Sequence, residues 1–466
     1  MVSTKQVSGR TPRGLILISI LITSFINPFL GAAINIALPA ISKEFSLGAV
    51  AMSWVSMAFL LSSAVFLVPF GKLADIWGRK RVFFTGNVII VLTSMLCALS
   101  VSGSMLILFR AIQGIGSAMV FGTGVAIITS VYPPNERGKA IGISVTAVYV
   151  GLSMAPFLGG ILTQYLGWRS IFYATIPFEV LVLWIVWRYI REEWADAKGE
   201  KFDWAGSVIY LVSMSAFMFG FSKLPDSTAI VLSVAGLIGL AGFGVTERKV
   251  SFPVFNVRLF ASNRLFAFSN LAALINYATT YAITFLLSLY LQYILHLSPR
   301  DAGMILITQP VLMAIVASIS GRLSDKYDPR ILASLGMSVI VGGLIMLAFL
   351  KTDSPITYLV VILAIVGFGF GMFSSPNTNA IMGSVGRKYL GVASATVGTM
   401  RLTGQMMSMG IATLILQIFV GNEPISDQYA PDFMISMKTT FIAFAVLCIL
   451  GVYASLARGK TEREKV

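Results

Sequence analysis

The sequence has little of the chemistry on which most enzymes depend. It contains one histidine, His296, and two cysteines, Cys97 and Cys448, which both fall inside apolar runs. Two cysteines supply neither a disulfide framework nor a cluster of metal ligands. The sequence also lacks the Gly-x-x-x-x-Gly-Lys-Ser/Thr loop that would bind ATP. We therefore expect no metal, no organic cofactor and no enzymatic activity.

Charged residues are scarce as well. They make up 12% of the chain, against roughly 25% in a water-soluble domain. Hydrophobic residues make up 56%, and the mean hydropathy is +0.84. The net charge of +14 does not indicate nucleic acid as a partner, because Lys and Arg lie in short segments between apolar runs instead of forming a patch. The expected class is an α-helical integral membrane protein, and the expected partner is the lipid bilayer.

Long apolar runs are what the sequence has in abundance. A helix needs about 20 apolar residues to cross a membrane, and fourteen stretches qualify. They are residues 14–40, 50–70, 82–101, 104–131, 139–162, 171–190, 205–222, 228–246, 265–295, 302–320, 331–350, 356–382, 391–420 and 439–457.

The distribution of Lys and Arg orients these spans. With the N-terminus in the cytoplasm, 26 of the 34 Lys and Arg residues fall in cytoplasmic segments and six in outer segments. Cytoplasmic loops of membrane proteins carry such an excess of positive charge. The remaining two, Arg110 and Arg401, lie within helices. We therefore expect a multi-pass protein of the cell membrane with both termini in the cytoplasm.

A repeated hairpin organises the chain. The segment Gly71–Arg81 (GKLADIWGRKR) returns as Gly321–Arg330 (GRLSDKYDPR), and each copy lies between two apolar runs. Internal repeats of this kind indicate two related bundles. We predict a six-helix bundle over residues 1–190, a cytoplasmic linker with two additional helices over 191–258, and a second six-helix bundle over 259–466.

Several motifs resemble the major facilitator superfamily, and specifically its fourteen-helix branch of drug:proton antiporters. The hairpin GKLADIWGRKR matches the loop between helices 2 and 3 of that family, and LFRAIQGIGSA (Leu108–Ala118) matches its helix-4 motif. Helix 5 matches the antiporter motif, with Ala155 in place of one glycine. The segments NIALP, GWRSIF and FDWAG also resemble this branch. The resemblance covers nearly the whole chain.

The resemblance implies a latch between the bundles. Asp75 is expected near the start of helix 13, around Gly391, and Asp325 near the start of helix 5, around Gly138. A carboxylate at a helix N-terminus is favourable by roughly 0.3–2 kcal/mol, and such a latch would favour the outward-open state. The alternative is that these charges only set the topology. The gating-loop candidates are Gly71, Asp75, Arg79, Lys80, Arg81, Gly321, Asp325 and Arg330.

Helix 5 is expected to form a tight contact between the bundles. Small residues let helix backbones approach closely, and Pro156 removes one backbone hydrogen bond and bends the helix. By resemblance, this helix seals the pathway against leakage in antiporters, and the alternative is ordinary helix packing. The residues of the motif are Gly142, Gly151, Pro156, Gly159 and Gly160.

Three residues are candidates for proton coupling. Arg110 and Gln113 fit the helix-4 motif, whose arginine is linked to proton coupling in the family. Glu179 is the one acidic residue expected at membrane depth, where a desolvated carboxyl can hold a proton near neutral pH. Alternatively, Pro177 bends helix 6 and Glu179 bonds to the freed backbone. The family usually has an aspartate where this chain has Leu30.

A loosely selective pocket is expected between the bundles. Charges near the bilayer centre usually mark a pathway, so we expect Arg401 and Arg110 to project into one water-accessible cavity. Polar groups on an apolar wall suit bulky, amphipathic molecules, although each one could simply join two helices. The pocket candidates are Arg401, Gln405, Asn27, Asn35, Asn276, Tyr277, Gln309 and Asn377.

These features together predict a secondary transporter that works by alternating access. It is expected to export hydrophobic or amphipathic compounds in exchange for protons, with the proton gradient as its energy source and a monomer as the working unit. One alternative is a proton-coupled carrier of an anionic metabolite or lipid, because the chain keeps two arginines and lacks the helix-1 acid. Another is a membrane sensor or structural subunit that moves nothing.

Overall fold

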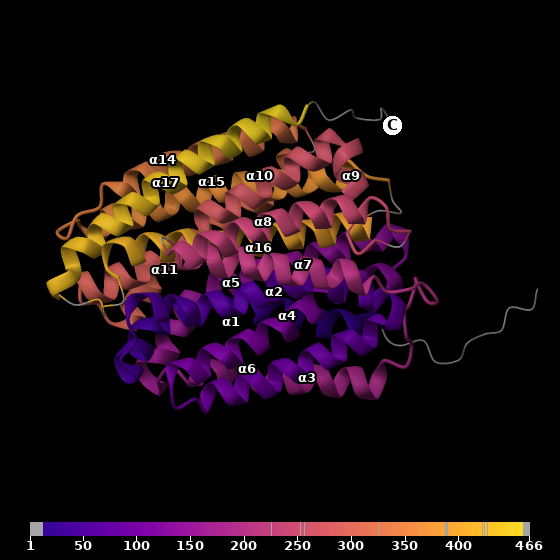
Figure 1. Cartoon of the computed structure of the whole chain (residues 1–466), viewed down its shortest axis with the longest axis horizontal. Coiled ribbons are helices and arrows are strands. Elements are labelled where there is room, and N and C mark those ends of the chain that lie inside the picture. Colours follow the sequence, from indigo (N-terminus) through magenta and orange to yellow (C-terminus); the bar gives the residue numbers. More distant parts are fainter. Residues whose placement is uncertain are drawn as a thin grey trace, which may run out of the picture.

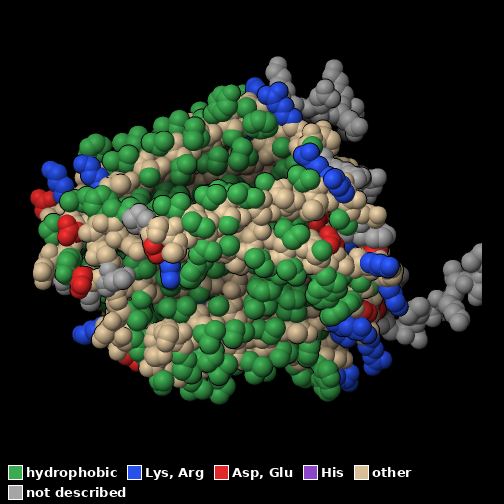
Figure 2. Space-filling view, viewed as in Figure 1, with side chains coloured by type: hydrophobic (Ala, Val, Ile, Leu, Met, Phe, Trp, Pro, Cys, Tyr) green, Lys and Arg blue, Asp and Glu red, His purple; other side chains and the backbone are tan. Residues whose placement is uncertain are grey.

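The chain folds into fourteen membrane-spanning helices in a computed structural model, as predicted. The structure describes residues 13–224, 226–251, 253–255, 257–324, 326–386, 390–421, 423, 425 and 427–459, and these residues form helices and connecting segments without a strand. Lys and Arg side chains gather toward the two ends of the molecule, and hydrophobic side chains cover the band between them (Figure 2). That band is the surface expected to face lipid.

The first six helices form the N-bundle. Inside it, α1 packs on α5 and α6, whereas α4 lies against both α2 and α3. Ser102 caps α4 by accepting a hydrogen bond from the backbone N–H of Met105 at 3.3 Å, which satisfies one of the free donors at a helix start. The helices are α1 (Arg13–Phe45), α2 (Ala49–Trp77), α3 (Arg79–Ala98), α4 (Gly103–Val131), α5 (Pro134–Leu166) and α6 (Ser170–Tyr189).

The last six spans form the C-bundle, which lies beside the N-bundle in Figure 1. Two of these spans are divided. The ninth span consists of α10 (Arg264–Thr280), α11 (Ala282–Leu289) and a π-helical turn (Tyr290–Ile294), and the tenth consists of α12 (Pro299–Leu306) and α13 (Thr308–Leu323). The others are α14 (Pro329–Ala348), α15 (Ile356–Gly383), α16 (Leu390–Phe419) and α17 (Ala430–Ala457).

Two additional helices lie between the bundles in the view of Figure 1. They are α7 (Trp204–Ser222) and α8 (Ser227–Glu247), and the short α9 (Val257–Ser262) follows them. The helix α7 packs tightly on α8 and also contacts α2 of the N-bundle and α16 of the C-bundle. The inserted pair is therefore attached to both bundles.

The two bundles repeat the same packing. In the N-bundle, Gly86 of α3 lies against the backbone of Gly116 of α4, and in the C-bundle Gly336 of α14 lies against the backbone of Gly369 of α15. These pairs are 250 and 253 residues apart along the chain. Such contacts need glycine because a side chain would separate the helices. The repeat seen in the sequence is thus a repeat of helix contacts.

The breaks in the ninth and tenth spans were not predicted, because both were expected to be continuous. Near the first break, the backbone N–H of Ala282 donates to the Ser408 hydroxyl of α16 at 3.0 Å. Near the second, Pro310 has no N–H to donate to the carbonyl of Leu306, one turn earlier. Each span is therefore divided where a helical hydrogen bond is replaced or missing.

Candidate functional site

The hydrogen bonds that join the two bundles are concentrated at one end of the molecule. We call the end that carries the hairpin Gly71–Arg81 the basic end, and the other the opposite end. Among the described residues, the side-chain bonds between the bundles lie from mid-depth to the opposite end. They are Tyr281 to the Gly31 carbonyl (3.1 Å), Ser288 to the Asn35 carbonyl (2.9 Å), Gln292 to the Ile36 carbonyl (3.0 Å), Thr413 to Ser53 (2.9 Å), Ser153 to the Pro310 carbonyl (3.1 Å) and Arg300 to Tyr165 (3.0 Å).

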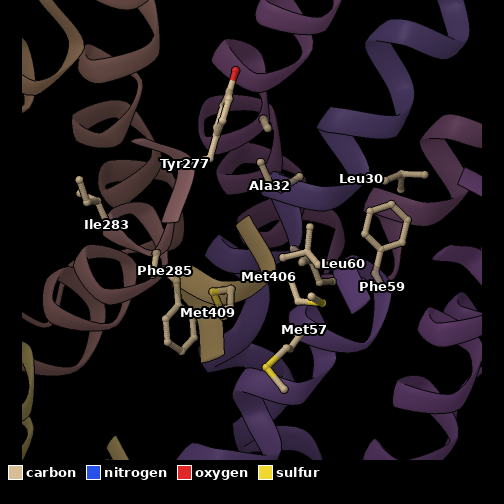
Figure 3. Packing of buried hydrophobic residues seen from close by; sticks show 14 of the residues in the cluster. Leu30, Ala32, Met57, Phe59, Leu60, Tyr277, Ile283, Phe285, Met406 and Met409 are labelled. Carbon is tan, nitrogen blue, oxygen red and sulfur yellow. The ribbon is translucent and has the colours of Figure 1, made fainter. Parts of the chain in front are cut away.

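An apolar layer accompanies these bonds. Figure 3 shows Met406 and Met409 of α16 beside Met57 and Leu60 of α2, with Phe285 of α11 next to Met409. All five side chains are at most 2% exposed. Methionine adapts its shape to irregular gaps, so this layer excludes water between the bundles.

The helix α5 shows where the bundles separate. Gly160 lies against the Pro299 carbonyl of α12, and Gly303 of α12 lies against the Pro156 carbonyl. Gly142 is 18 residues before Gly160, which is five whole helical turns and about 27 Å along the same face. No atom outside α5 lies within 4 Å of the place where a Cβ of Gly142 would be. The bundles therefore touch at the opposite end and part toward the basic end.

The other glycines of the antiporter motif have a different partner. Gly151 lies against the backbone of Phe25, and Gly159 lies against Ala33; both of these neighbours belong to α1. These two glycines therefore tighten the N-bundle itself, whereas Gly160 and Pro156 form the contact between the bundles.

Arg110 lies inside the N-bundle and is fully buried. Its Nη1 donates to Gln113 Oε1 at 2.6 Å, and Gln113 in turn donates to the Ser94 hydroxyl at 2.8 Å. Its Nε donates to the Val55 carbonyl at 3.2 Å, and the guanidinium lies 4.3 Å from the centre of the Phe59 ring. The expectation that Arg110 projects into a water-accessible cavity is wrong for this conformation, because α2 and α3 enclose it.

No carboxylate balances the charge of Arg110 among the described residues. Its Nη2 has no hydrogen-bond partner, and Leu30, where the resemblance would lead one to expect an acid, is fully buried. Asn35 accepts a hydrogen bond from Ser56 at 2.6 Å, while the nitrogen of its amide is unpaired. Helices α1, α2 and α4 thus hold a connected polar region that lacks an acid.

Glu179 is the isolated acid of the N-bundle. The residue is fully buried in α6, and neither carboxylate oxygen has a hydrogen-bond partner. The alternative that Glu179 bonds to backbone freed by Pro177 is therefore not supported. A charged carboxylate without a partner is very costly in an apolar interior, so the protonated form is favoured in this conformation.

Arg401 occupies a different environment from Arg110. It lies about 16 Å from the start of α16 and is half-buried, with its guanidinium 5.0 Å from the centre of the Phe121 ring of α4. Within the part of the chain that the structure describes, this guanidinium makes no hydrogen bond or ion pair. Its donors are thus available to water or to a bound molecule.

The remaining pocket candidates divide into two groups. Tyr277, Gln309 and Gln405 are 7–9% exposed, Asn276 is fully buried, and both the Asn276 amide and Gln309 Oε1 are unpaired. Asn27 donates to the Thr23 carbonyl of its own helix while its Oδ1 is unpaired. Asn377 is engaged on both sides of its amide and is the candidate that offers no free amide group.

The partner of Asn377 is Arg458, which sequence reasoning missed. Its Nη1 donates to Asn377 Oδ1 at 2.8 Å, and its Nη2 donates to the Pro329 carbonyl at 2.8 Å. Arg458 is 2% exposed. It follows the last apolar run directly, so from the sequence it looked like one more charge that sets the topology.

The first hairpin is bound within its own half of the molecule. Asp75 accepts hydrogen bonds from Nε and Nη2 of Arg79 at 2.8 and 2.6 Å, and Arg79 reaches Ser130 of α4. None of the described residues of α16 bonds to Asp75, and residues 387–389, directly before that helix, lie outside the described residues, so the expected latch stays a prediction. Asp325, its counterpart in the second hairpin, lies outside the described residues.

The other hairpin residues have local roles. Gly71 lies close to Gly122 of α4, and Gly321 lies against Ser375 of α15. Arg81 pairs with Glu193 at 3.6 Å, and the same carboxylate accepts from the backbone N–H of Lys80 at 2.9 Å. Arg330 pairs with Asp328 at 3.9 Å.

Two related helical bundles that touch at one end of the membrane and part at the other form the framework of a membrane transport protein. The chain belongs to the Major Facilitator Superfamily, whose family model matches residues 20–260 and 269–466. The resemblance seen in the motifs is thereby confirmed.

Known relatives cover most of the chain. The riboflavin transporter RibZ of Clostridioides difficile is 29% identical over 442 residues, which are 94% of this chain and 96% of that protein. The multidrug resistance protein Stp of Mycobacterium tuberculosis is 29% identical over 413 residues, or 87% of this chain and 76% of that protein. The protein is therefore a transporter of this family, and its relatives include proteins named for different substrates.

A solved structure confirms the fold. The bacterial homologue of the human lysosomal transporter Spinster, in an inward-facing and unoccupied conformation, matches with a TM-score of 0.70. The match covers 97% of this chain and 98% of that one, at 18% sequence identity. At this identity the likeness concerns the fold alone.

Proposed function

We propose that this protein exports hydrophobic or amphipathic compounds across the cell membrane in exchange for protons, and that it works by alternating access as a monomer. The relatives named as multidrug resistance proteins support this substrate class. The excess of Lys and Arg at the basic end supports placing that end, and both termini, in the cytoplasm.

One observation carries the proposal. On a single face of α5, Gly160 touches α12 while Gly142 has no neighbour from another helix. A static binding protein has no need for bundles that are sealed at one end and parted at the other. This arrangement fits an inward-open state, in which a substrate reaches the pathway from the cytoplasm.

Glu179 is the proposed proton carrier. It is the acid at membrane depth in the N-bundle, and it has no hydrogen-bond partner in this conformation. Because a partnerless buried carboxylate favours protonation, Glu179 can hold a proton here and release it when the bundles rearrange. In this proposal Arg110 and Gln113 form a fixed positive region that responds to the change in the charge of Glu179.

Flux into proteoliposomes tests the proposal. Ethidium movement is measured with and without an imposed pH gradient, in vesicles with and without the purified protein. We expect the pH gradient to drive ethidium uptake only when the protein is present. Ethidium binding without any flux under either condition would point to a sensor or a structural subunit instead.

A second candidate function is a carrier of an anionic or aromatic metabolite. Two observations favour it: Arg401 offers unpaired donors between the bundles, and one relative over nearly the whole chain is named as a riboflavin transporter. Flux of riboflavin phosphate, measured in the same vesicles without ethidium flux, would favour this function over drug export.

A further inference from the structure

Arg401 lies among aromatic rings that come from both bundles. Phe121 of α4 and Tyr149 of α5 belong to the N-bundle, whereas Tyr277 of α10 and Phe370 of α15 belong to the C-bundle. Counted along their helices, these residues and Arg401 lie about 15–22 Å from the basic end. They therefore share one level, near mid-depth, where the bundles begin to part.

The contacts between these side chains are specific. The Arg401 guanidinium faces the Phe121 ring at 5.0 Å, and Tyr277 packs edge-on against Phe370 with the ring centres 5.4 Å apart. Tyr277 also adjoins both Tyr149 and Arg401. We call these five residues, Phe121, Tyr149, Tyr277, Phe370 and Arg401, the aromatic site.

Arg401, and two buried amides on helices that carry residues of the site or pack against them, have hydrogen-bonding capacity that the described residues do not use. Arg401 makes no hydrogen bond or ion pair within the described residues. The amide of Asn276, next to Tyr277, is fully buried and unpaired. Gln309 Oε1 is also unpaired, and the backbone of Gln309 touches Gly367, one turn before Phe370. Unpaired polar groups in a buried place are costly unless another molecule satisfies them.

The charge of the site selects among possible ligands. The site contains a guanidinium and no carboxylate, and the buried acid Glu179 belongs to α6, on which α1 and α3 pack. A cationic ligand would therefore meet an unbalanced positive charge. A guanidinium instead suits carbonyl, carboxylate or phosphate oxygens, and it stacks on flat aromatic rings.

We propose that the aromatic site binds a planar heteroaromatic compound that is neutral or anionic. Its ring lies between the rings of the two bundles, and its carbonyl or acidic edge accepts hydrogen bonds from Arg401. This inference rests on the proposed transport function and names the class of compound that the mid-depth site prefers. Because the contacts come from both bundles, binding of the ring would depend on how far apart the two bundles are.

Flavins are suitable probes because they are flat, fluorescent and rich in carbonyl oxygens. The purified full-length protein in lipid nanodiscs is titrated with riboflavin, with riboflavin phosphate and with ethidium, which is flat but cationic. We expect saturable binding of the two flavins, with fluorescence quenched by the stacked rings, and at least about tenfold weaker binding of ethidium.

Variants assign the binding to the aromatic site. Arg401→Gln is expected to weaken flavin binding about tenfold or more, because charge-assisted hydrogen bonds are lost. Phe370→Leu should weaken it several-fold through the loss of stacking. Two controls remove the same groups elsewhere: Arg188→Gln at the exposed end of α6, and Phe368→Leu, whose ring is 44% exposed. Both controls should bind flavins as the unchanged protein does.

Two outcomes would overturn the proposal: ethidium binding more tightly than either flavin, or flavin binding that Arg401→Gln leaves unchanged. An unchanged melting temperature of Arg401→Gln shows that its loss of binding is not loss of folding. The vesicle assay keeps the two proposals apart. If the protein moves ethidium but binds no flavin, the proposed site is wrong and the proposed export function stands. If flavin binding depends on Arg401 but no compound is transported, the site stands and the export function is wrong.

Discussion

Glu179 has no hydrogen-bond partner among the described residues that would stabilise its charge, and this isolation suits its proposed role as a proton carrier. A carboxyl in an ion pair would stay charged, whereas one enclosed by apolar neighbours changes its protonation when its surroundings change. The sequence indicated this residue correctly as an acid at membrane depth. It could not show that the side chain faces into the bundle, because Pro177 and the neighbouring polar groups left other bonding patterns open.

Replacing Glu179 tests its role directly. In Glu179→Gln we expect uptake driven by a pH gradient to fall at least about tenfold, because the amide cannot take up a proton, while exchange of substrate without a gradient continues. Flux into proteoliposomes under both conditions measures the difference. Glu136→Gln, at an exposed site at the start of α5, is the control. Gradient-driven uptake that survives in Glu179→Gln would exclude this carboxyl as the carrier.

In the C-bundle, Arg458 supplies a guanidinium group to the hairpin, as Arg79 does in the N-bundle. The position in the second hairpin that matches Arg79 is Pro329, which has no cation to offer. The guanidinium comes instead from the end of α17 and donates to the carbonyl of Pro329 itself. Burial lowers the pKa of Arg458 to about 10, which still leaves it protonated at neutral pH. Sequence comparison of the two hairpins could not reveal a substitute that is more than a hundred residues away.

Loss of this guanidinium should weaken the C-bundle. In Arg458→Gln we expect the free energy of unfolding to fall by about 2 kcal/mol, because hydrogen bonds from a charged donor are lost and the Pro329 carbonyl loses its partner. A melting temperature lowered by several degrees in nanodiscs would show it. Arg188→Gln, at the exposed end of α6, should melt as the unchanged protein does, and equal melting of both variants would contradict the prediction.

At the scale of helices, the sequence predicted where each span lies but not how each one bends. Apolar length alone located all fourteen spans, although the last helix begins at Ala430 instead of near residue 439. The break after Thr280 depends on Ser408, a residue of another helix, so no local pattern could signal it. Pro310 was visible, yet a proline in the first turn of a helix is ordinary, and it gave no reason to divide the span.

The helix α5 offers a test of the conformational cycle. A side chain at Gly160 would lie 2.5 Å from the Pro299 carbonyl, so Gly160→Ala should force the bundles apart at the opposite end. The readout is maleimide labelling of a cysteine placed at Ser153, which is 7% exposed at the contact with Pro310. The native cysteines are buried and give a quiet background.

We expect labelling of Ser153→Cys to become several-fold faster when Gly160→Ala is added. Gly242→Ala is the matched control, because no neighbouring atom lies within 4 Å of that position on α8. Labelling that is equally slow in both double variants would mean that the contact between Gly160 and α12 does not hold the opposite end closed.

Across the whole molecule, the first connector joins the N-bundle to the inserted helix pair along the basic end. Residues 191–203 follow α6 and bind along the first hairpin. The backbone N–H of Ala197 donates to the Asp75 carbonyl at 2.9 Å, and that of Arg79 donates to the Trp194 carbonyl at 2.8 Å. The sequence indicated only a charged linker, since backbone bonds leave no signal in side-chain types.

The ion pairs of this connector should differ in strength. Glu200 pairs with Lys72 at 2.6 Å, with side chains 32% and 16% exposed, whereas Asp196, which pairs with Arg79 at 2.8 Å, is 72% exposed. Exposed ion pairs contribute little, at about 0–1 kcal/mol. The pair between Glu200 and Lys72 should therefore hold the connector more firmly than the pair made by Asp196.

This ranking can be measured by proteolysis. Lys198 and Lys201 are exposed on the connector and are sites for trypsin once the segment lifts from the hairpin. We expect Glu200→Gln to speed cleavage several-fold and Asp196→Asn to change it little, and high salt should reduce the difference because it screens the remaining pairs. Cleavage that is faster in Asp196→Asn than in Glu200→Gln would show that exposure does not rank these contacts. Cleavage that neither variant changes would show instead that backbone bonds hold the connector and that its release does not depend on charge.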